Sequence, residues 1–195
     1  SVLAKHGATI VFGGNGNLEA WVGAGSPRAD NFKTYLAKRL YALALDEERV
    51  YGGFEDGKLR IFRRDDSKCE KTLQVGKPVK GVWAAGATFV TANGQGELVV
   101  RDKRTYESGA SARHDPRGAP YGLLGLTGRW ARLATWTQRE LRLWDYPSLQ
   151  ARGGATVRDD GDRQTRIGDA CFGDDRLWVA VGRSICQVRL PSPAP

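Results

Sequence analysis

One unit recurs five times along the chain, and this repetition restricts the possible folds more than any other feature. Each copy places a turn before an aliphatic residue and then alternates polar and apolar positions; the copies are GNGNLEAW, EDGKLRIF, GQGELVVRD, TQRELRLWD and GRSICQVRL. The aliphatic residues lie 39 to 44 residues apart and are Leu18, Leu59, Leu98, Leu141 and Ile185. This period is typical of four short strands with their turns, and the alternation is typical of a strand with one inward face.

Each unit is predicted to form a four-stranded antiparallel sheet. An apolar run precedes every repeated segment, and the two are joined by turns such as Asp56-Gly57, which tolerate the positive φ of a tight hairpin. An inner strand is expected before this hairpin and an outer strand after it. The last unit is incomplete, because the Pro-rich tail 191–195 lacks amide donors for a sheet. The predicted units cover residues 1–39, 40–78, 79–120, 121–166 and 167–190.

The expected architecture is a β-propeller. A sheet of about 40 residues with two partly apolar faces must stack on copies of itself, and a radial stack is a propeller. Trp21, Phe62 and Trp144 recur at one position of the unit, which favours packing between sheets over a cofactor cage. The fold class is therefore predicted to be all-β, with about five four-stranded antiparallel blades. No apolar run is long enough for a membrane span.

The units resemble WD repeats. The third strand of the fourth unit ends in Trp144-Asp145, and its counterpart in the third unit ends in Arg101-Asp102. Residues 68–84 are similar to the family's passage from the end of one repeat to the start of the next. The resemblance implies a WD40-like β-propeller over residues 1–190, with a role in binding other proteins.

The sequence also departs from the family's pattern. Val75-Gly76 stands where the family has a Gly-His pair, and only Asp56 keeps an acidic residue in the second hairpin turn. We therefore expect the family's internal hydrogen-bond network of His, Asp, Ser or Thr, and Trp to be absent. Family members usually have seven blades, whereas five units are visible here. We expect the chain to be a fragment of a longer protein; the alternatives are a ring completed by another chain and a ring of five irregular blades.

The chain is strongly basic, with a formal net charge of +8 that arises from 21 Arg and 9 Lys against 22 acidic residues. Arg forms planar, bidentate contacts with carboxylate or phosphate, so the charge favours an acidic protein or RNA as partner. Genomic base composition is the alternative explanation for the Arg content. Cys69, Cys171 and Cys186 have no C-x-x-C spacing, which argues against a disulfide framework or zinc site and favours a reducing intracellular compartment.

The sequence contains no catalytic motif. There is no G-x-S-x-G elbow, no H-E-x-x-H and no phosphate-binding loop, and His6 and His114 lie far apart in the chain. Cys171 and Cys186 fall on the first and third strands of one unit, where we expect two small buried side chains without a disulfide. We therefore predict no enzymatic activity, no cofactor, no metal ion and no small-molecule substrate.

The basic residues are predicted to concentrate on one rim. In a propeller blade, the turn between strands two and three and the link from strand four to the next blade share an edge, which we call the upper rim. Basic residues exceed acidic ones there, whereas the two are equal in number on the opposite rim. The longest links, 112–120 and 158–166, are expected to bind a partner or, alternatively, to be solvated loops. The predicted docking residues are Lys77, Lys80, Arg113, His114, Arg117, Arg158, Arg163 and Arg166.

These observations predict a non-catalytic protein-interaction scaffold. It would be a subunit of a larger multiprotein or ribonucleoprotein assembly, and acidic partners would dock on the Arg-rich upper rim. The alternative is a propeller that binds RNA or a ribonucleoprotein directly.

Overall fold

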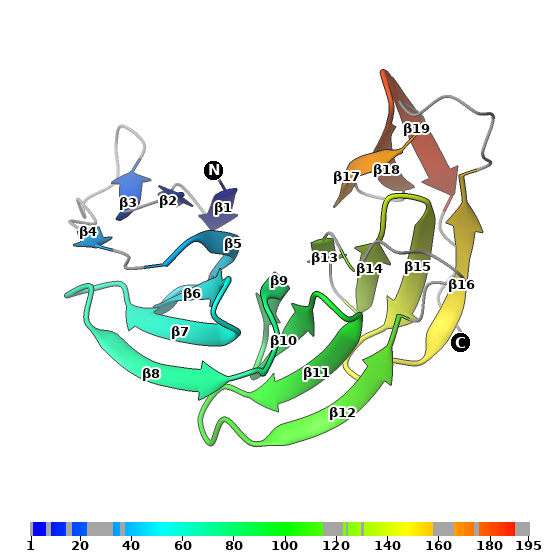
Figure 1. Cartoon of the computed structure of the whole chain (residues 1–195). Coiled ribbons are helices and arrows are strands. Elements are labelled where there is room, and N and C mark those ends of the chain that lie inside the picture. The colour runs from blue at the N-terminus through cyan, green and yellow to red at the C-terminus, as the bar shows by residue number, and fades with distance from the viewer. Residues whose placement is uncertain are drawn as a thin grey trace.

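A computed structural model describes residues 2–6, 9–14, 17–22, 33–35, 38–114, 123, 125–129, 131–157, 166–173 and 176–189. All regular elements within these residues are β-strands, and they form five antiparallel sheets that we call blades 1 to 5. The blades follow one another along an open arc, with blade 1 and blade 5 at its two ends (Figure 1).

The strands of each blade pair in sequence order. Blade 1 contains β1 (Val2–His6), β2 (Thr9–Gly13), β3 (Asn17–Val22) and β4 (Lys33–Tyr35). Blade 2 contains β5 (Leu40–Leu45), β6 (Arg49–Phe54), β7 (Lys58–Arg63) and β8 (Cys69–Gln74). Blade 3 contains β9 (Val79–Ala85), β10 (Thr88–Asn93), β11 (Glu97–Asp102) and β12 (Ser108–Arg113). Blade 4 contains β13 (Gly125–Arg129), β14 (Arg132–Trp136), β15 (Glu140–Asp145) and β16 (Ala151–Thr156), and blade 5 contains β17 (Ile167–Phe172), β18 (Arg176–Val181) and β19 (Ser184–Arg189).

The predicted fold class is confirmed: the described residues form four four-stranded blades and one three-stranded blade, all antiparallel and of the propeller type, and these blades do not close into a ring. The inner strand of blade 4, β13, begins at Gly125. Pairing with β14 sets this register, because Gly125 lies opposite Trp136 and a Cβ at Gly125 would clash with the indole ring. Leu123 precedes the strand and is still buried between blades.

The expectation of buried cysteines in blade 5 is wrong. Cys171 and Cys186 are free and exposed. They do lie on the first and third strands, with β18 between them, as the sequence pattern indicated. For Cys171 the exposure follows from its place at the end of the arc, because it lies opposite exposed Trp178 on the face of blade 5 that no described blade covers.

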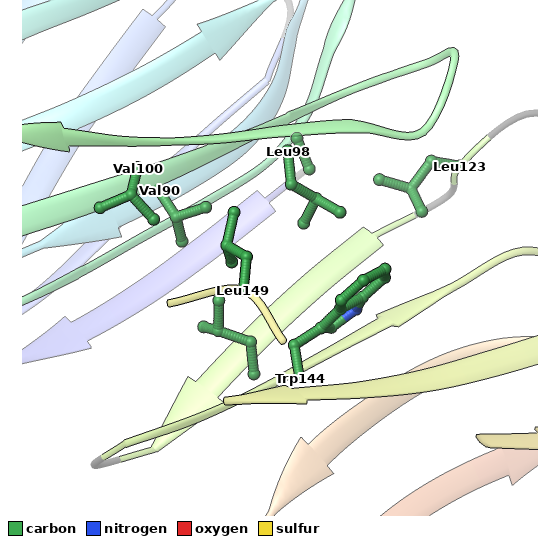
Figure 2. Packing of buried hydrophobic residues seen from close by; sticks show 8 residues of the cluster. Val90, Leu98, Val100, Leu123, Trp144 and Leu149 are labelled. Carbon is green, nitrogen blue, oxygen red and sulfur yellow. The ribbon is translucent and has the colours of Figure 1, made fainter. Parts of the chain in front are cut away.

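The core lies between successive blades rather than inside any one of them. We call the face of a blade that packs on the next blade its forward face, and the other its backward face. Between blades 3 and 4, Val90 and Leu98 on the forward face of blade 3 pack against Trp144 and Leu149 of blade 4 (Figure 2). Equivalent hydrophobic clusters join the other neighbouring blades. Each such junction buries apolar surface that an isolated sheet would leave in water.

A partly buried ion pair ties blade 2 to blade 3 on the side of the arc opposite the upper rim. Lys103 Nζ lies 2.7 Å from Asp46 Oδ2, which also accepts a hydrogen bond of 2.8 Å from the Tyr51 hydroxyl. Burial by itself would raise the pKa of Asp46. Hydrogen bonds from Lys103, Tyr51 and the amides of Glu48 and Arg49 outweigh that effect and lower the pKa below 3.8.

This ion pair predicts an acid-sensitive contribution to stability. Because the folded pKa of Asp46 is lowered, its contribution is complete above 3.8 and is lost as the pH falls through the folded pKa. Asp46→Asn should lower the free energy of unfolding at neutral pH by about 1–3 kcal/mol and flatten its decline in acid. Denaturant unfolding from neutral pH to about pH 2 measures this. Asp65→Asn, at an exposed carboxylate, is the control; acid limbs of equal slope for wild type and Asp46→Asn would contradict the assignment.

Candidate functional site

Backbone hydrogen bonds assemble the upper rim from two kinds of loop. Val75, at the start of the link from blade 2 to blade 3, donates its N–H to Gly57 O over 2.8 Å. His114 does the same to Gly96 O over 2.8 Å in the next blade. In both cases the acceptor lies in the turn between strands two and three. The links and these turns therefore share one edge.

Three carboxylates of the described upper rim are engaged by neighbouring side chains. Asp56 Oδ2 lies 2.7 Å from Arg60 Nη2, and Glu140 Oε1 lies 2.9 Å from Arg142 Nε. Glu97 Oε2 accepts a hydrogen bond of 2.8 Å from Asn93 Nδ2. Asp56 and Glu140 thus have cationic partners of their own on the adjoining strands.

Several cations of the described upper rim, by contrast, have no acidic partner among the described residues. Within those ranges, no carboxylate lies within ion-pair distance of Lys38, Lys77, Arg113 or Arg183, all of which are exposed. On the opposite rim, Lys103 pairs with Asp46, Arg63 with Asp66, and Arg49 with Glu70, whereas exposed Arg104 forms no ion pair with a described carboxylate. Exposed cations without an acidic partner are therefore more numerous on the described upper rim.

Five of the eight predicted docking residues lie in the described part of the chain. Lys77 and Arg113 are exposed, and Lys80 and Arg166 are half-buried. The fifth, His114, is buried. The other three, Arg117, Arg158 and Arg163, lie outside the described residues.

Lys80 belongs to a cluster that the sequence did not reveal. Its Nζ lies 3.5 Å from the centre of the Tyr41 ring, and Arg39 Cζ lies 5.2 Å from the same centre. Burial lowers the pKa of Lys80, and the Arg39 guanidinium lowers it further. Two cations over one ring make a compact positive site whose aromatic face is already occupied.

His114 is not a docking residue, and this part of the prediction is wrong. Its side chain is 0% exposed, and Nδ1 lies 2.7 Å from Thr135 Oγ1. The link carries the imidazole inward between blades 3 and 4, where it cannot meet a partner. Adjacent residues in an extended segment point to opposite sides, so only one of Arg113 and His114 can face outward. The sequence alone did not show which of the two it is.

The expected absence of the His, Ser or Thr, and Trp network is also wrong for blade 4. Trp144 Nε1 donates a hydrogen bond of 2.8 Å to Thr135 Oγ1, which also contacts His114. His114 Nε2 lies 3.8 Å from Oε2 of Glu140, the first residue of β15. Glu140 thus supplies the carboxylate beside this network. The sequence feature that could have revealed this network is His114, which precedes Trp144-Asp145 by less than one repeat length.

A hollow of about 470 Å³ lies on the concave side of the arc, where the inner strands meet. Most of the residues that line it are hydrophobic, but polar atoms make up the larger part of its exposed surface, and Lys5, His6 and Asp169 are among the polar side chains. In the part of the chain described here, no three His, Cys, Asp or Glu side chains converge as metal ligands would. That part also contains no helix of the length and apolar character needed to cross a membrane.

Comparison with known proteins agrees with the fold. No protein-family model matches the chain. The ciliary WD repeat-containing protein ctxp80 of Euplotoides octocarinatus is 20% identical over 185 residues, which are 95% of this chain and 25% of that protein. A chain of the mitotic checkpoint complex superposes with a TM-score of 0.76 at 15% identity, over 98% of this chain and 63% of that one. BamB from Moraxella catarrhalis superposes with a TM-score of 0.71 at 11% identity, over 96% of this chain and 60% of that one.

The fold is that of a WD40-like β-propeller. The chain spans a quarter of the length of the curated relative that it matches, and about three fifths of the two solved chains. The likeness to the solved structures concerns the fold alone, because the identities are low.

Proposed function

We propose that this chain is a non-catalytic scaffold whose upper rim binds acidic segments of partner proteins within a larger assembly. The uncompensated charge of Lys38, Lys77, Arg113 and Arg183 is the observation that supports it. These cations are exposed along one edge, on turns and strand ends that a stack of sheets holds in place. The names of the relatives, a WD repeat-containing protein and a checkpoint complex, are consistent with a role in protein assembly.

An acidic protein segment fits the rim better than RNA does. Proteins that bind single-stranded RNA combine positive charge with exposed aromatic rings on which bases stack. Tyr41 is the ring beside the described rim cations, and Lys80 and Arg39 lie over it. A flexible carboxylate-rich segment needs no stacking surface, and separate cations along the edge can each meet one carboxylate.

A paired charge reversal tests the proposal. Lys77→Glu with Arg113→Glu should weaken binding of a fluorescein-labelled poly-glutamate peptide by about tenfold, because each exposed contact contributes up to about 1 kcal/mol. Fluorescence anisotropy at low and physiological salt measures the affinity, and the variant should also show a smaller salt dependence. The thermal midpoint should stay unchanged, since both side chains are exposed.

Lys68→Glu with Arg104→Glu is the matched control. It changes the net charge equally but alters exposed cations of the opposite rim. Equal weakening by both pairs would mean that only net charge matters and would overturn a rim-specific site. Tighter, steeply salt-dependent binding of an oligouridylate than of the peptide, lost in the upper-rim variant, would replace the acidic partner by RNA.

A further inference from the structure

The inner strands of blades 2 and 3 each contain a β-bulge at the same position of the repeat. Pairing of β5 with β6 passes over Tyr41, the residue after buried Leu40. Pairing of β9 with β10 passes over Lys80, the residue after buried Val79. A bulge leaves one residue out of the strand pairing and redirects its side chain, and bulges are common beside functional sites. Both strands begin at the upper rim, so Tyr41 and Lys80 are redirected there.

The two redirected side chains meet across the junction between the blades. β5 and β9 lie side by side on the concave side of the arc (Figure 1). Lys80 Nζ lies 3.5 Å from the centre of the Tyr41 ring, and Arg39, just before β5, places its Cζ 5.2 Å from the same centre. The stem of Lys80 passes Gly94, where an added Cβ would lie 3.8 Å from Lys80 Cγ. Packing of the stem and the face of the ring therefore hold the ammonium group in place.

Backbone hydrogen bonds build the cluster in the same way in both blades. Glu55 donates its N–H to Arg39 O over 3.0 Å, and Gly94 donates its N–H to Pro78 O over 2.8 Å. Each acceptor precedes a bulge by two residues, and each donor lies in the turn between strands two and three of its blade. The cluster thus lies wholly within blades 2 and 3, each of which has another blade on both sides.

The cluster contains two cations without a counter-charge among the described residues. No described carboxylate lies within ion-pair distance of Lys80 Nζ or the Arg39 guanidinium. Glu55 accepts a hydrogen bond of 3.3 Å from the Arg39 backbone N–H, not from the side chain. Burial lowers the pKa of Lys80, and the nearby guanidinium lowers it further. The two positive charges therefore disfavour each other, and a bound anion would relieve this repulsion.

A second lysine–tyrosine pair between the same blades has its counter-charge. Lys71 Nζ lies 5.5 Å from the centre of the Tyr106 ring, and the Tyr106 hydroxyl donates a hydrogen bond of 2.7 Å to Glu70 Oε1. Lys71 belongs to the outer strand β8, away from the concave side. In the described part of the chain, no such carboxylate contacts Tyr41. The pair at the upper rim therefore differs from its counterpart by a missing negative charge, which a ligand can supply.

We propose that Arg39 and Lys80 bind a phosphate monoester carried by a serine or threonine of the acidic partner segment. This proposal rests on the proposed function and names the group that anchors the segment. A phosphate monoester carries a charge of about −1.5 to −2 at pH 7, which matches two cations better than a singly charged carboxylate does. Its oxygens can accept hydrogen bonds from the guanidinium and the ammonium group together. Exposed Lys38 and Lys77, on the links before β5 and β9, would contact acidic residues that flank the phosphate.

A phosphorylated protein segment fits this site better than other carriers of phosphate. The backbone of RNA has one charge per phosphate, and the ring on which a base could stack is covered by the two cations. A free phosphate ion would gain nothing from Lys38 and Lys77. An extended segment can place its phosphate between Arg39 and Lys80 and its acidic neighbours on those two lysines.

Three peptides that differ at one residue test the proposal. Each is labelled with fluorescein and has two glutamates on either side of a central phosphoserine, glutamate or serine. Fluorescence anisotropy at neutral pH measures their affinities. The phosphoserine peptide should bind about five- to tenfold more tightly than the glutamate peptide, and the serine peptide should bind most weakly.

Single substitutions connect this preference to the cluster. Lys80→Gln and Arg39→Gln should each remove the preference for phosphoserine over glutamate, because each removes one of the two cations. Lys71→Gln is the matched control, since it removes the lysine of the pair that has a counter-charge, and it should leave the preference unchanged. Lys77→Glu with Arg113→Glu should weaken the binding of both peptides but keep the preference. Circular dichroism of each variant checks that the fold is retained.

The outcomes distinguish this site from the proposed function. Equal affinities of the phosphoserine and glutamate peptides would overturn the phosphate site and leave the acid-binding rim standing. A preference that survives both Lys80→Gln and Arg39→Gln would also overturn it, because the phosphate would then bind elsewhere. A preference that depends on the cluster, with equal weakening by Lys77→Glu/Arg113→Glu and by the opposite-rim control pair, would support the phosphate site and overturn the rim-specific binding.

Competition identifies the source of the phosphate. Unlabelled phosphoserine peptide should displace the labelled peptide at much lower concentrations than inorganic phosphate does. Equal potency of the two competitors would mean that the site takes a free ion, which overturns the assignment to a partner segment. Failure of all three peptides to bind would overturn both this site and the proposed function.

Discussion

Replacing Thr135 by valine is expected to lower the free energy of unfolding by about 2–4 kcal/mol. The hydroxyl of Thr135 is completely buried and is shared by Trp144 Nε1 at 2.8 Å and His114 Nδ1 at 2.7 Å. Valine keeps the shape of the side chain, so the loss arises from the polar atoms and not from a cavity. Two buried ring nitrogens lose this oxygen together, and a buried polar group without its partner costs about 1–3 kcal/mol. Denaturant unfolding measures the difference.

The chain supplies a matched control at the same position of the neighbouring blade. Thr91 lies opposite Val99 as Thr135 lies opposite Arg142, and it is also completely buried. Its hydroxyl makes one long contact, 3.5 Å to Val99 O, and no His–Trp pair shares it. Thr91→Val should therefore cost no more than about 1 kcal/mol. Equal losses for the two variants would mean that the network of blade 4 adds nothing to stability.

Replacing Gly96 by alanine is expected to cost about 2–4 kcal/mol. Gly96 has a φ of +83°, and a Cβ there would lie 2.1 Å from the carbonyl oxygen of His114. The left-handed backbone alone costs about 1 kcal/mol for alanine, and moving a packed backbone adds about 1–3 kcal/mol. His114 also donates its N–H to Gly96 O, so the shift would disturb the His114–Thr135 contact. The combination with Thr135→Val should therefore be less than additive.

Gly86→Ala separates the effect of φ from that of space. Gly86 has a φ of +53°, and nothing lies within 4 Å of a Cβ built there. Its substitution should cost about 1 kcal/mol, from the backbone conformation alone. Chemical denaturation of both variants under the same conditions gives the comparison. A loss for Gly96→Ala no larger than for Gly86→Ala would show that the upper rim yields to the added methyl group.

The sequence determined the fold class and the five blades that the described residues form. A period of two within each segment and a longer repeat of 39 to 44 residues are properties of strand geometry and of stacking sheets, so they remain legible without tertiary contacts. The same reasoning located the turns and links of the upper rim, because connectivity alone places them at one edge of each blade. It did not reveal the register of β13, which pairing with β14 sets by placing Gly125 opposite Trp136.

Tertiary structure decided which charged and polar residues are available to a partner. Arg113 and His114 are adjacent basic residues. Arg113 is exposed, whereas His114 is completely buried against Thr135. It also decided which copy of a repeated position is buried: Leu141 and Ile185 match in the repeat but differ from 1% to 75% in exposure. The periodic pattern states which side chains point toward a neighbouring blade, but only the packed structure shows whether a neighbour is there.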